Sequence, residues 1–390
     1  MKANLHINAT VMNTLTESRT GRSVDLLLEN DIFDRIDIAA VEDEESDYRR
    51  DKARILSFKR NYDVEKANLF TKIYGTLKWC FSVYIELSSQ KYQVINCHSI
   101  NLLPLSVVLK FKSQSLLIYD IHELETETIA MTSVRKFFSK IVETVLIRFV
   151  DYTIVVSEPI KDWYVKKYKI ENISVIKNMP SIQPDRIDLN FSLRSKFHIP
   201  KEDIVFVYHG ALLKGRGIER LIYIFSQLID RSKHLVIIGF GDLEETCRFS
   251  ARNNTNIHFN SALNKSELLE FIKEADVGLN FIDNSCLNHE FCLPNKLWDY
   301  LSVPIPIMVN NLEGMRMVIE EYNCGWLVED DNKSLKATIE NLNRNDLSIK
   351  KNNARNSLAK WGWNFEKQKL LKIYQQILKN YDQENTFPRS

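Results

Sequence analysis

The segment Leu293–Pro306 reads LPNKLWDYLSVPIP and predicts a short amphipathic helix. Pro294 suits the first turn of a helix, where a missing N–H costs no hydrogen bond. Leu297, Trp298 and Leu301 recur at i, i+1 and i+4 and give the helix one apolar face. We therefore expect this face to be buried and the opposite side to be polar.

The polar side of this helix carries Asn295, Lys296 and Asp299, of which the last follows the other two by three and four residues. A helix N-terminus attracts phosphate, and a lysine there adds a point charge. An aspartate one turn later can accept hydrogen bonds from two ribose hydroxyls. The segment thus fits a nucleotide diphosphate, but on its own it fits equally well an amphipathic surface helix with a solvated charged edge.

The residues around this helix alternate between strand and helix patterns. Val205–Phe225 reads as an apolar strand, a Gly-rich turn and a helix, and His234–Asp242 reads as a strand that ends in a turn. Asn256–Ile282 reads as strand, loop, helix and strand. This alternation is typical of a parallel sheet covered by helices.

Three motifs occur in a fixed order: the turn Gly215-Arg216-Gly217, the LPNKLWDY helix and the segment EEYNCGWLV. In this order they resemble the donor-binding domain of GT-B glycosyltransferases, most of all the retaining group 1, or GT4-like, family and its LPNKL-type branch. The resemblance extends over nearly the whole chain. It implies an α/β fold class: GT-B, with two Rossmann-like doubly wound domains facing a cleft.

A chain of 390 residues also suits two domains better than one. We expect an acceptor-binding domain at residues 1–183, a nucleotide-sugar donor domain at 184–360, and a C-terminal helix at 361–390 that crosses back to the first domain. Trp361, Trp363 and Phe365 are the anchors expected for that helix. Within the first domain, a strand is expected at Ile36–Val41, followed by helical structure to about Gln90.

The first half of the chain contains a matching motif. Lys91–Glu127 resembles the family's first-domain segment, in which a strand ends in a D-x-H-E turn, here Asp120-Ile121-His122-Glu123. Open α/β sheets bind ligands at the carboxyl ends of their strands. By resemblance, His122 contacts the transferred sugar, and Glu123 orients it or meets the acceptor. His98, Ser99 and Ser157 are further acceptor-site candidates, although Ser157 also fits a helix N-cap.

For the donor site, the resemblance assigns the phosphates to Gly215, Arg216, Gly217, Asn295 and Lys296. Asp299 is expected to hold the ribose, Leu263 lies in the loop expected at the nucleobase, and Glu290 is a candidate contact for the donor sugar. No D-x-D motif follows a plausible strand. We therefore expect no metal and no cofactor. The co-substrate expected is a nucleotide sugar, that is, a sugar linked to UDP or GDP.

The chain also departs from the family pattern. Ala211 stands where many members have an arginine, and Phe291 stands where the first acid of an E-x7-E pattern would fall. No glycine precedes Gly21, although a Gly-rich loop normally follows the first strand. These departures keep two alternatives open beside a glycosyltransferase: a non-catalytic GT-B accessory subunit and a nucleotide-sugar epimerase.

The composition is that of an ordinary globular protein, with 44% hydrophobic and 26% charged residues. A net charge of +1 gives no reason to expect nucleic acid binding. The six cysteines show no CxxC pair, which favours free thiols in a reducing compartment. We see no signal peptide and no apolar run of about 20 residues. A cytoplasmic glycosyltransferase of surface polysaccharide or glycolipid synthesis is expected.

Two basic segments contain aromatic residues. Arg49–Lys78 is followed closely by Trp79 and Phe81, and Arg135–Lys140 includes Phe137 and Phe138. Basic amphipathic segments bind anionic membrane surfaces, which suggests peripheral contact with the inner face of the plasma membrane. The alternative is a solvated helix face whose apolar side lies in the core.

Overall fold

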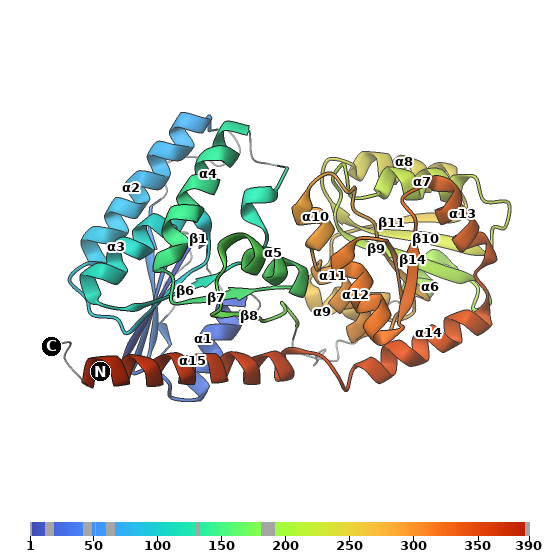
Figure 1. Ribbon diagram of the computed structural model, residues 1–390. Coiled ribbons are helices and arrows are strands. Elements are labelled where there is room, and N and C mark those ends of the chain that lie inside the picture. Colours follow the sequence, from blue (N-terminus) through green and yellow to red (C-terminus); the bar gives the residue numbers. More distant parts are fainter. Residues whose placement is uncertain are drawn as a thin grey trace. The chain divides into compact units, whose positions relative to one another are not determined.

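The computed structural model describes residues 2–11, 19–41, 49–50, 52–59, 67–129, 133–180 and 192–386. The chain divides into two compact units (Figure 1). Unit 1 comprises Met1–Lys177 and Glu366–Ser390, and unit 2 comprises Asn178–Phe365. The boundary expected between residues 183 and 184 falls within residues 181–191, which lie outside the described residues.

Unit 1 is built on a sheet with the strand order β3-β4-β2-β1-β5-β6-β7-β8. Among the described residues, neighbouring strands pair in parallel except β3 and β4, which are antiparallel. The strands are β1 (Ala3–Val11), β2 (Arg35–Val41), β3 (Arg49–Arg50), β4 (Ala53–Phe58), β5 (Val94–Cys97), β6 (Leu116–Asp120), β7 (Tyr152–Val155) and β8 (Ile173–Val175).

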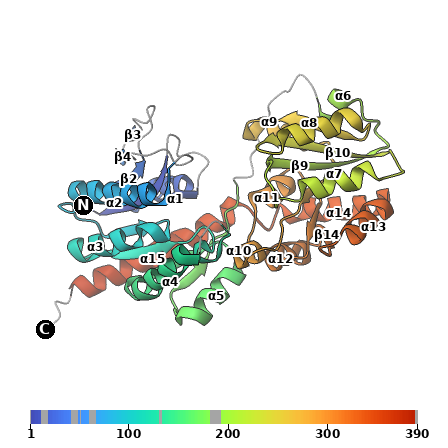
Figure 2. The ribbon, with the colours of Figure 1, turned by 90° about the horizontal axis from the view of Figure 1, so that it is seen from above.

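Helices cover both faces of this sheet, with α2, α3 and α4 on one side and α1 and α15 on the other (Figures 1 and 2). The helices are α1 (Arg19–Glu29), α2 (Leu69–Leu87), α3 (Leu103–Ser113), α4 (Ser133–Leu146), α5 (Glu158–Tyr168) and α15 (Trp363–Thr386), with short 3₁₀ turns η1 (Ile100–Leu102), η2 (Glu125–Glu127) and η3 (Ile147–Phe149). Because β1 pairs with both β2 and β5, the strand order reverses at β1. Open α/β sheets bind ligands beside such a reversal.

The strand expected at Ile36–Val41 is confirmed as β2, but the expectation of helix after it, to about Gln90, is wrong for the first described part of that range. Ala53–Phe58 forms β4, which pairs in parallel with β2, for example Ile55 with Ile38. The isolated segment has no strong period, so the pairing with β2 decides its structure. Helix α2 begins only at Leu69, where the Asn68 side chain accepts a hydrogen bond from the Thr71 amide.

Helix α15 begins in unit 2 and continues along unit 1. On unit 1, the Tyr374 hydroxyl donates to Asn96 Oδ1 at 2.6 Å, and its ring packs edge-on against Phe33. Trp361 does not act as the expected anchor on the first domain, because it packs against Trp298 in the core of unit 2.

Unit 2 has the strand order β11-β10-β9-β12-β13-β14, and all of these neighbours are parallel within the described residues. Its strands are β9 (Ile204–Ala211), β10 (Lys233–Phe240), β11 (Ile257–Ser261), β12 (Val277–Asn280), β13 (Ile307–Asn310) and β14 (Gly325–Val328). This 3-2-1-4-5-6 order is that of a dinucleotide-binding Rossmann fold, and it reverses between β9 and β12.

The helices of unit 2 lie on both faces of its sheet (Figure 1). They are α6 (Leu193–Phe197), α7 (Ile218–Ser226), α8 (Glu244–Asn253), α9 (Lys265–Ile272), α10 (Leu287–Phe291), α11 (Asn295–Ser302), α12 (Glu313–Tyr322), α13 (Asn332–Asn341) and α14 (Arg344–Ser357). Strand β9 supplies both cores: Val205 and Val207 face one, and Phe206 and Tyr208 face the other. This alternation follows from the period of two along a strand.

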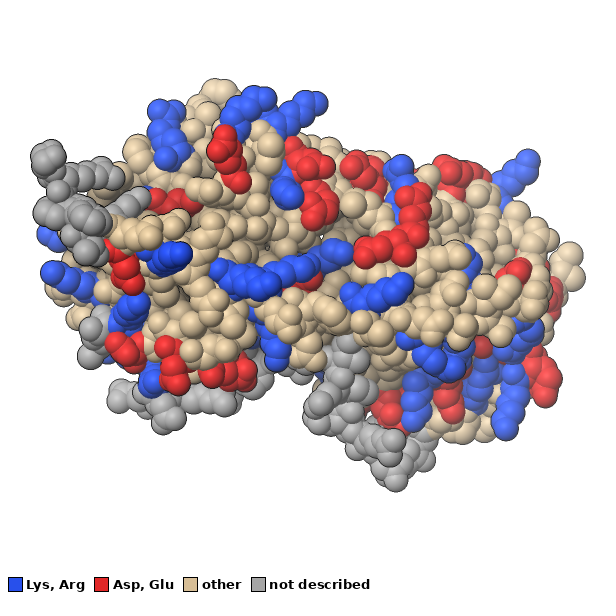
Figure 3. All heavy atoms as spheres, turned by 60° about the horizontal axis from the view of Figure 1, so that its bottom comes forward, with Lys and Arg blue, Asp and Glu red and all other residues tan. Residues whose placement is uncertain are grey.

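The surface is mixed in charge. On the face seen in Figure 3, basic and acidic side chains are interspersed over both units, in keeping with the net charge of +1. Within the described part of the chain, no helix has the length and hydropathy that a bilayer crossing requires.

Candidate functional site

In unit 2, the Gly-Arg-Gly turn connects β9 to α7 at the point where the strand order reverses. Gly215 and Gly217 have φ angles of +77° and +72°, which side chains other than glycine rarely adopt. A Cβ on Gly217 would lie 2.5 Å from the Phe281 Cβ, so glycine is also required for space. The Asp283 amide donates to the Gly215 carbonyl at 3.0 Å, which ties the turn to the end of β12.

Arg216, in this turn, and Lys296, at the start of α11, make no hydrogen bond or ion pair among the described residues. Instead, Lys296 Nζ lies 3.7 Å from the centroid of the Tyr208 ring, a cation–π contact. Burial and the charge of Arg216 together lower the pKa of Lys296 to about 7, although Asp299 opposes them. Two cations without acidic partners therefore lie near each other at the beginnings of α7 and α11.

Helix α11 is fixed to the sheet by its apolar face, as the sequence predicted. Leu297, Trp298 and Leu301 are fully buried. The Tyr300 hydroxyl oxygen lies 3.0 and 3.1 Å from the carbonyl oxygens of Val207 and Leu279, so its single proton is shared between β9 and the end of β12. This anchoring sets the position of Lys296 and Asp299 relative to the Gly-Arg-Gly turn.

Asp299 is buried and paired in the structure. Its carboxylate accepts from Lys265 Nζ, at the start of α9, and lies 3.6 Å from the ring nitrogen Nε2 of His209. Desolvation lowers the pKa of His209 well below its ordinary value, and the charges of Lys296 and Lys265 act in the same direction. A ribose bound at Asp299 would therefore also meet Lys265.

The other donor-site candidates occupy less direct positions. Asn295 Oδ1 accepts from Asn178 Nδ2 at 3.1 Å, and Leu263 packs against the core that α11 helps to form. Glu290 accepts from the Glu313 amide at 2.9 Å and from Asn284 Nδ2 at 2.5 Å. Because its two oxygens bond the start of α12 and a neighbouring loop, Glu290 holds local structure in this conformation.

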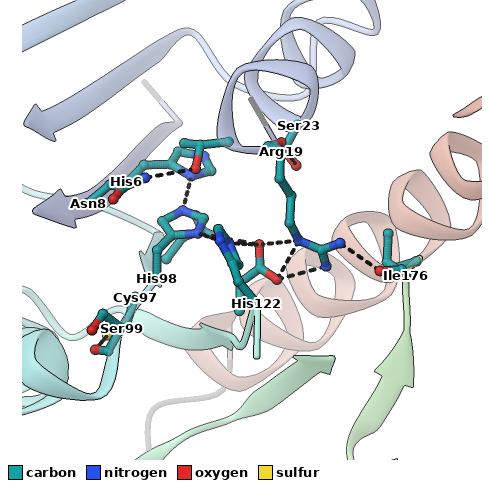
Figure 4. A network of polar contacts seen from close by, with 12 residues as sticks. His6, Asn8, Arg19, Ser23, Cys97, His98, Ser99, His122 and Ile176 are labelled. Carbon is teal, nitrogen blue, oxygen red and sulfur yellow. Dashed lines mark hydrogen bonds and ion pairs between the residues drawn. The ribbon is translucent and has the colours of Figure 1, made fainter. Parts of the chain in front are cut away.

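In unit 1, the polar centre is a buried ion pair at the end of β6. The Arg19 guanidinium, at the first residue of α1, donates to the Asp120 carboxylate through Nε and Nη2, with distances of 2.8–3.2 Å (Figure 4). Its Nη1 donates to the carbonyl of Ile176 at 2.6 Å. Burial raises the pKa of Asp120, but the charge of Arg19 and bonds from histidines outweigh it and hold that pKa well below 3.8.

Two histidines lie on the other side of Asp120. His98 Nδ1 is 3.2 Å from His122 Nε2 and 3.4 Å from Asp120 Oδ2. His122 Nε2 lies 3.6 Å from the same carboxylate oxygen, and its side chain is 35% exposed. His98 is buried, and desolvation lowers its pKa below the ordinary value. The structure thus brings together His98 and His122, two residues that the sequence analysis gave as separate candidates.

The facing atoms of His98, Asp120 and His122 lie within 4.8 Å of one another, a spacing that metal ligands also show. A set of two imidazoles and one carboxylate can bind divalent transition metals. Here, however, the carboxylate is already held by the Arg19 cation, whose positive charge opposes a metal ion. Of the described residues, no other group of three or more His, Cys, Asp or Glu side chains has this spacing.

The remaining acceptor-site candidates, all on unit 1, are Ser99, Glu123 and Ser157. The Ser99 hydroxyl donates to Glu125 Oε2 at 2.8 Å, and burial raises the pKa of Glu125 to about 7. Glu123 is exposed. Ser157 is buried at the N-cap of α5, but its side chain makes no cap hydrogen bond.

Comparison with known protein families identifies unit 2. Residues 203–345, which include the Gly-Arg-Gly turn and α11, match the family model described as glycosyl transferases group 1. This unit is a group 1 glycosyltransferase domain.

Solved structures extend the likeness to the whole chain. A sucrose-phosphate synthase from Thermosynechococcus elongatus aligns with a TM-score of 0.73 and 14% identity, over 97% of this chain and 100% of that one. HepE from Anabaena, in complex with UDP and glucose, aligns with a TM-score of 0.64 and 12% identity, over 98% and 100% of the two chains. The expectation of a GT-B fold is confirmed.

A curated relative is the chitobiosyldiphosphodolichol beta-mannosyltransferase of Kluyveromyces lactis. It is 23% identical over 343 aligned residues, covering 79% of this chain and 76% of the relative. The alignment therefore extends beyond the region that the family model matches.

The departures of this glycosyltransferase from its family pattern fall at different places. Ala211 is an exposed residue at the end of β9, and Phe291 ends the short helix α10. The missing Gly-rich loop concerns residues 12–18, which lie outside the described residues.

Sequence reasoning missed His6, Arg19 and Lys265. His6 stands in the strand segment NLHINA, and a histidine inside an otherwise apolar strand was the available signal. The sequence around Arg19 and Lys265 contained no such signal, because their partners, Asp120 and Asp299, lie in distant parts of the chain.

Proposed function

We propose that this glycosyltransferase moves a hexosyl group from a UDP- or GDP-linked sugar to a glycan or lipid-linked acceptor, without a metal ion. The observation that carries this proposal is the pair of cations Arg216 and Lys296, which lack acidic partners at the topological switch point of a Rossmann-like unit. A leaving diphosphate needs this compensation as its charge develops. No nucleic acid partner is proposed.

The relatives agree with this choice of substrates. The HepE structure contains UDP and glucose. The name of the K. lactis relative includes a sugar linked to diphosphodolichol, a lipid carrier. We infer a lipid-linked acceptor of surface polysaccharide or glycolipid synthesis for this chain.

For the chemistry, we propose that the donor's own phosphate oxygen accepts the proton of the attacking hydroxyl and that the anomeric configuration is retained. His122 and Glu123 then lie on the acceptor-binding unit as contacts for the sugar or the acceptor. Proton NMR of the product's anomeric signal decides the stereochemistry, and an inverted anomer contradicts this part of the proposal.

The donor site is tested by calorimetry and thermal shift with UDP, GDP, dTDP and CMP. A ligand at a hundredfold excess over its Kd adds about 2.7 kcal/mol to the stability. We expect one nucleotide class to bind, and Arg216→Ala to remove that binding. Arg220→Ala is the matched control, because Arg220 lies one turn further along, on α7, and is paired with Asp330. If no nucleotide binds, the proposal fails in favour of a non-catalytic accessory subunit.

A transferase needs an acceptor for turnover, whereas an epimerase does not. Turnover of a bound nucleotide sugar only when a glycan or glycolipid is present supports transfer. Conversion of the sugar without an acceptor supports the epimerase alternative.

We also propose that unit 1 binds an anionic membrane surface through the outer face of α2, α3 and α4. Helix α3 packs against both α2 and α4. These helices expose large apolar side chains, among them Phe70 at 85% and Tyr74 at 69%. The exposed set is Phe70, Ile73, Tyr74, Leu77, Phe81, Ile85, Val108, Phe111, Val134, Phe137, Phe138, Ile141 and Val145.

This exposed set argues against the reading of a solvated face over a buried apolar side. On α2 the apolar residues recur at helical spacing, so they form one stripe on the outside, while Trp79 and Val83 face the core. Large exposed apolar patches mark interaction sites. The charges favour an anionic bilayer, because the three helices carry Lys72, Lys78, Lys110, Lys112, Arg135, Lys136 and Lys140 against Glu86 and Glu143. Lys110 pairs with Asp151, and Lys136 and Lys140 pair with Glu127, so basic residues still outnumber acidic ones when these partners are included.

Vesicle co-sedimentation tests this surface. We expect binding to phosphatidylglycerol vesicles at low salt, weaker binding to phosphatidylcholine, and loss in Phe81→Asp and Phe137→Asp. Phe249→Asp, which changes a phenylalanine that is 67% exposed on α8 of unit 2, is the control and should bind normally. If the chain dimerises through these residues and ignores vesicles, the membrane proposal is wrong. Because nucleotide binding is measured without lipid, the two proposals fail independently.

A further inference from the structure

A continuous line of hydrogen bonds crosses the interior of unit 1 and ends at the half-buried His122. Figure 4 shows its last part, from His6 through His98 to His122. The line begins at Tyr374 on α15 and passes through β5 and β1. The successive contacts are Tyr374 Oη to Asn96 Oδ1 at 2.6 Å, Asn96 Nδ2 to Asn4 Oδ1 at 2.6 Å, Asn4 Nδ2 to His6 Nε2 at 3.1 Å, His6 Nδ1 to His98 Nε2 at 2.9 Å, and His98 Nδ1 to His122 Nε2 at 3.2 Å.

Taken alone, each amide or imidazole inside this line could donate a hydrogen bond to either of its two neighbours, because amides can flip and imidazoles have two tautomers. One end removes this freedom. Asn96 Nδ2 lies 3.5 Å from the carbonyl oxygen of Leu5, which can only accept a hydrogen bond. The nitrogen of the Asn96 amide must therefore face Leu5 and Asn4, and its oxygen must face Tyr374.

The other end imposes the same direction. His98 Nδ1 lies 3.4 Å from Asp120 Oδ2, and an ionised carboxylate can only accept. Arg19 keeps Asp120 ionised through its paired N–H groups. A lone pair on His98 Nδ1 would face this negative charge, so the atom must carry the proton.

The two ends determine the groups between them. Asn4 accepts from Asn96 through Oδ1 and donates to His6 through Nδ2. His6 accepts at Nε2 and donates from Nδ1, and His98 accepts at Nε2. We propose that His98 is a positioning residue, fixed as the neutral Nδ1–H tautomer, whose single N–H points between Asp120 Oδ2 and His122 Nε2 and so holds the His122 ring against the carboxylate.

The surroundings keep these rings neutral. His6 and His98 are buried and stacked, with ring centroids 5.2 Å apart. Desolvation lowers the pKa of each, and their proximity lowers the pKa of His6 further. A second proton on either ring would also need an acceptor, and the described neighbours offer donors at those positions.

The proposal has two chemical consequences. The Nε2 atom of His122 faces His98 and the Asp120 carboxylate, so any contact of His122 with an oxygen of the sugar or acceptor is made through Nδ1. The proton on His98 Nδ1 also occupies the atom that a metal ion would need, so the His98–Asp120–His122 cluster is closed to metals. The tautomers stand without the proposed function, whereas the contact with a sugar rests on it.

Nitrogen NMR of the wild-type protein tests the tautomers directly. Long-range ¹H–¹⁵N correlation spectra of histidine-labelled protein separate protonated from unprotonated ring nitrogens. We expect His6 and His98 to be protonated at Nδ1 and bare at Nε2 at neutral pH, with signals assigned from His6→Gln and His98→Asn. A bare Nδ1 on His98 overturns the proposal, whatever the enzymatic activity is.

A pair of substitutions tests the positioning role. The amide of His98→Asn replaces Nδ1–H, whereas the amide of His98→Gln lies near the position of Nε2. We expect kcat to fall by about tenfold more in the glutamine variant, the cost of one hydrogen bond, with little change in KM for the nucleotide sugar. Equal losses in both variants contradict a role through Nδ1.

The matched control is His234 in unit 2, which is also buried, bonded to His258 at 3.0 Å and to Asp203 at 2.9 Å. His234→Asn and His234→Gln change the same residue type away from the site. They should leave kcat and the ¹⁵N signals of His98 unchanged. If the His98 signals shift in these variants too, the effects of the His98 substitutions come from repacking of the whole protein and not from Nδ1.

Discussion

The two units share a sheet topology but assemble their sites in different ways. In unit 2, the site residues come from short motifs that continue the strands: the turn at residues 215–217 and helix α11. In unit 1, the site gathers His6, Arg19, His98 and Asp120 from four elements and is supported by α15 from the end of the chain. A site made from local motifs can be predicted from the sequence, whereas a site made from single residues that are distant in the chain cannot.

The largest expected effect is on the free energy of unfolding, and it should differ between the two buried carboxylates, Asp120 and Asp299. Asp120→Asn should destabilise the protein by about 3 kcal/mol, because Arg19 stays buried without its partner charge. Asp299→Asn should cost about 1 kcal/mol or less, because Lys265 has a side chain that is 32% exposed and can be rehydrated. Urea unfolding followed by circular dichroism measures both. Equal costs would remove this difference between the units.

The next effect concerns catalysis in unit 2. Lys296→Met should lower kcat by about 10²–10³-fold, because it removes a charge aimed at the developing diphosphate. Folding should be intact or slightly improved, since the substitution removes a desolvated cation. Lys214→Met, in the exposed part of the same turn, is the control and should change kcat little. A small effect of Lys296→Met on kcat would place the phosphate elsewhere.

The pH dependence of nucleotide binding follows from the pKa of Lys296, which is about 7 in the free protein. A bound diphosphate raises that pKa, so binding takes up a proton when the pH exceeds 7. Affinity should be constant below pH 7 and fall by up to about tenfold per pH unit above it. Calorimetry between pH 6 and about pH 9 measures this slope. Lys296→Met should abolish the slope, and a slope that survives must come from another group.

The smallest effect lies at the far end of the hydrogen-bonded line in unit 1. Tyr374→Phe should cost about 1 kcal/mol, the loss of one buried hydrogen bond to Asn96. The tautomers of His6 and His98 should not change, because Leu5 and Asp120 fix the direction without Tyr374. Thermal unfolding and the histidine ¹⁵N spectra measure the two outcomes. A tautomer change would mean that α15 controls the site.

The elements with strong local signals were predicted well. The apolar stripe of α11 is buried as expected, and the glycines of residues 215–217 have the positive φ angles that a tight turn requires. β4 was missed, because its strand structure depends on pairing with β2 and not on its own sequence. The anchoring of Trp361 was misplaced for a similar reason, since its partner Trp298 lies 63 residues earlier in the chain.

The sequence by itself determined the alternation of strands and helices, the tight Gly-Arg-Gly turn, the buried face of α11 and the family of unit 2. These depend on residues within a few positions of one another, through periodicity and turn geometry. Only the tertiary structure decided that Arg19 pairs with Asp120, that His6 supports His98, and that the apolar stripe of α2 faces outward. Such contacts depend on the order in which strands join a sheet, which sets neighbours that local sequence does not encode.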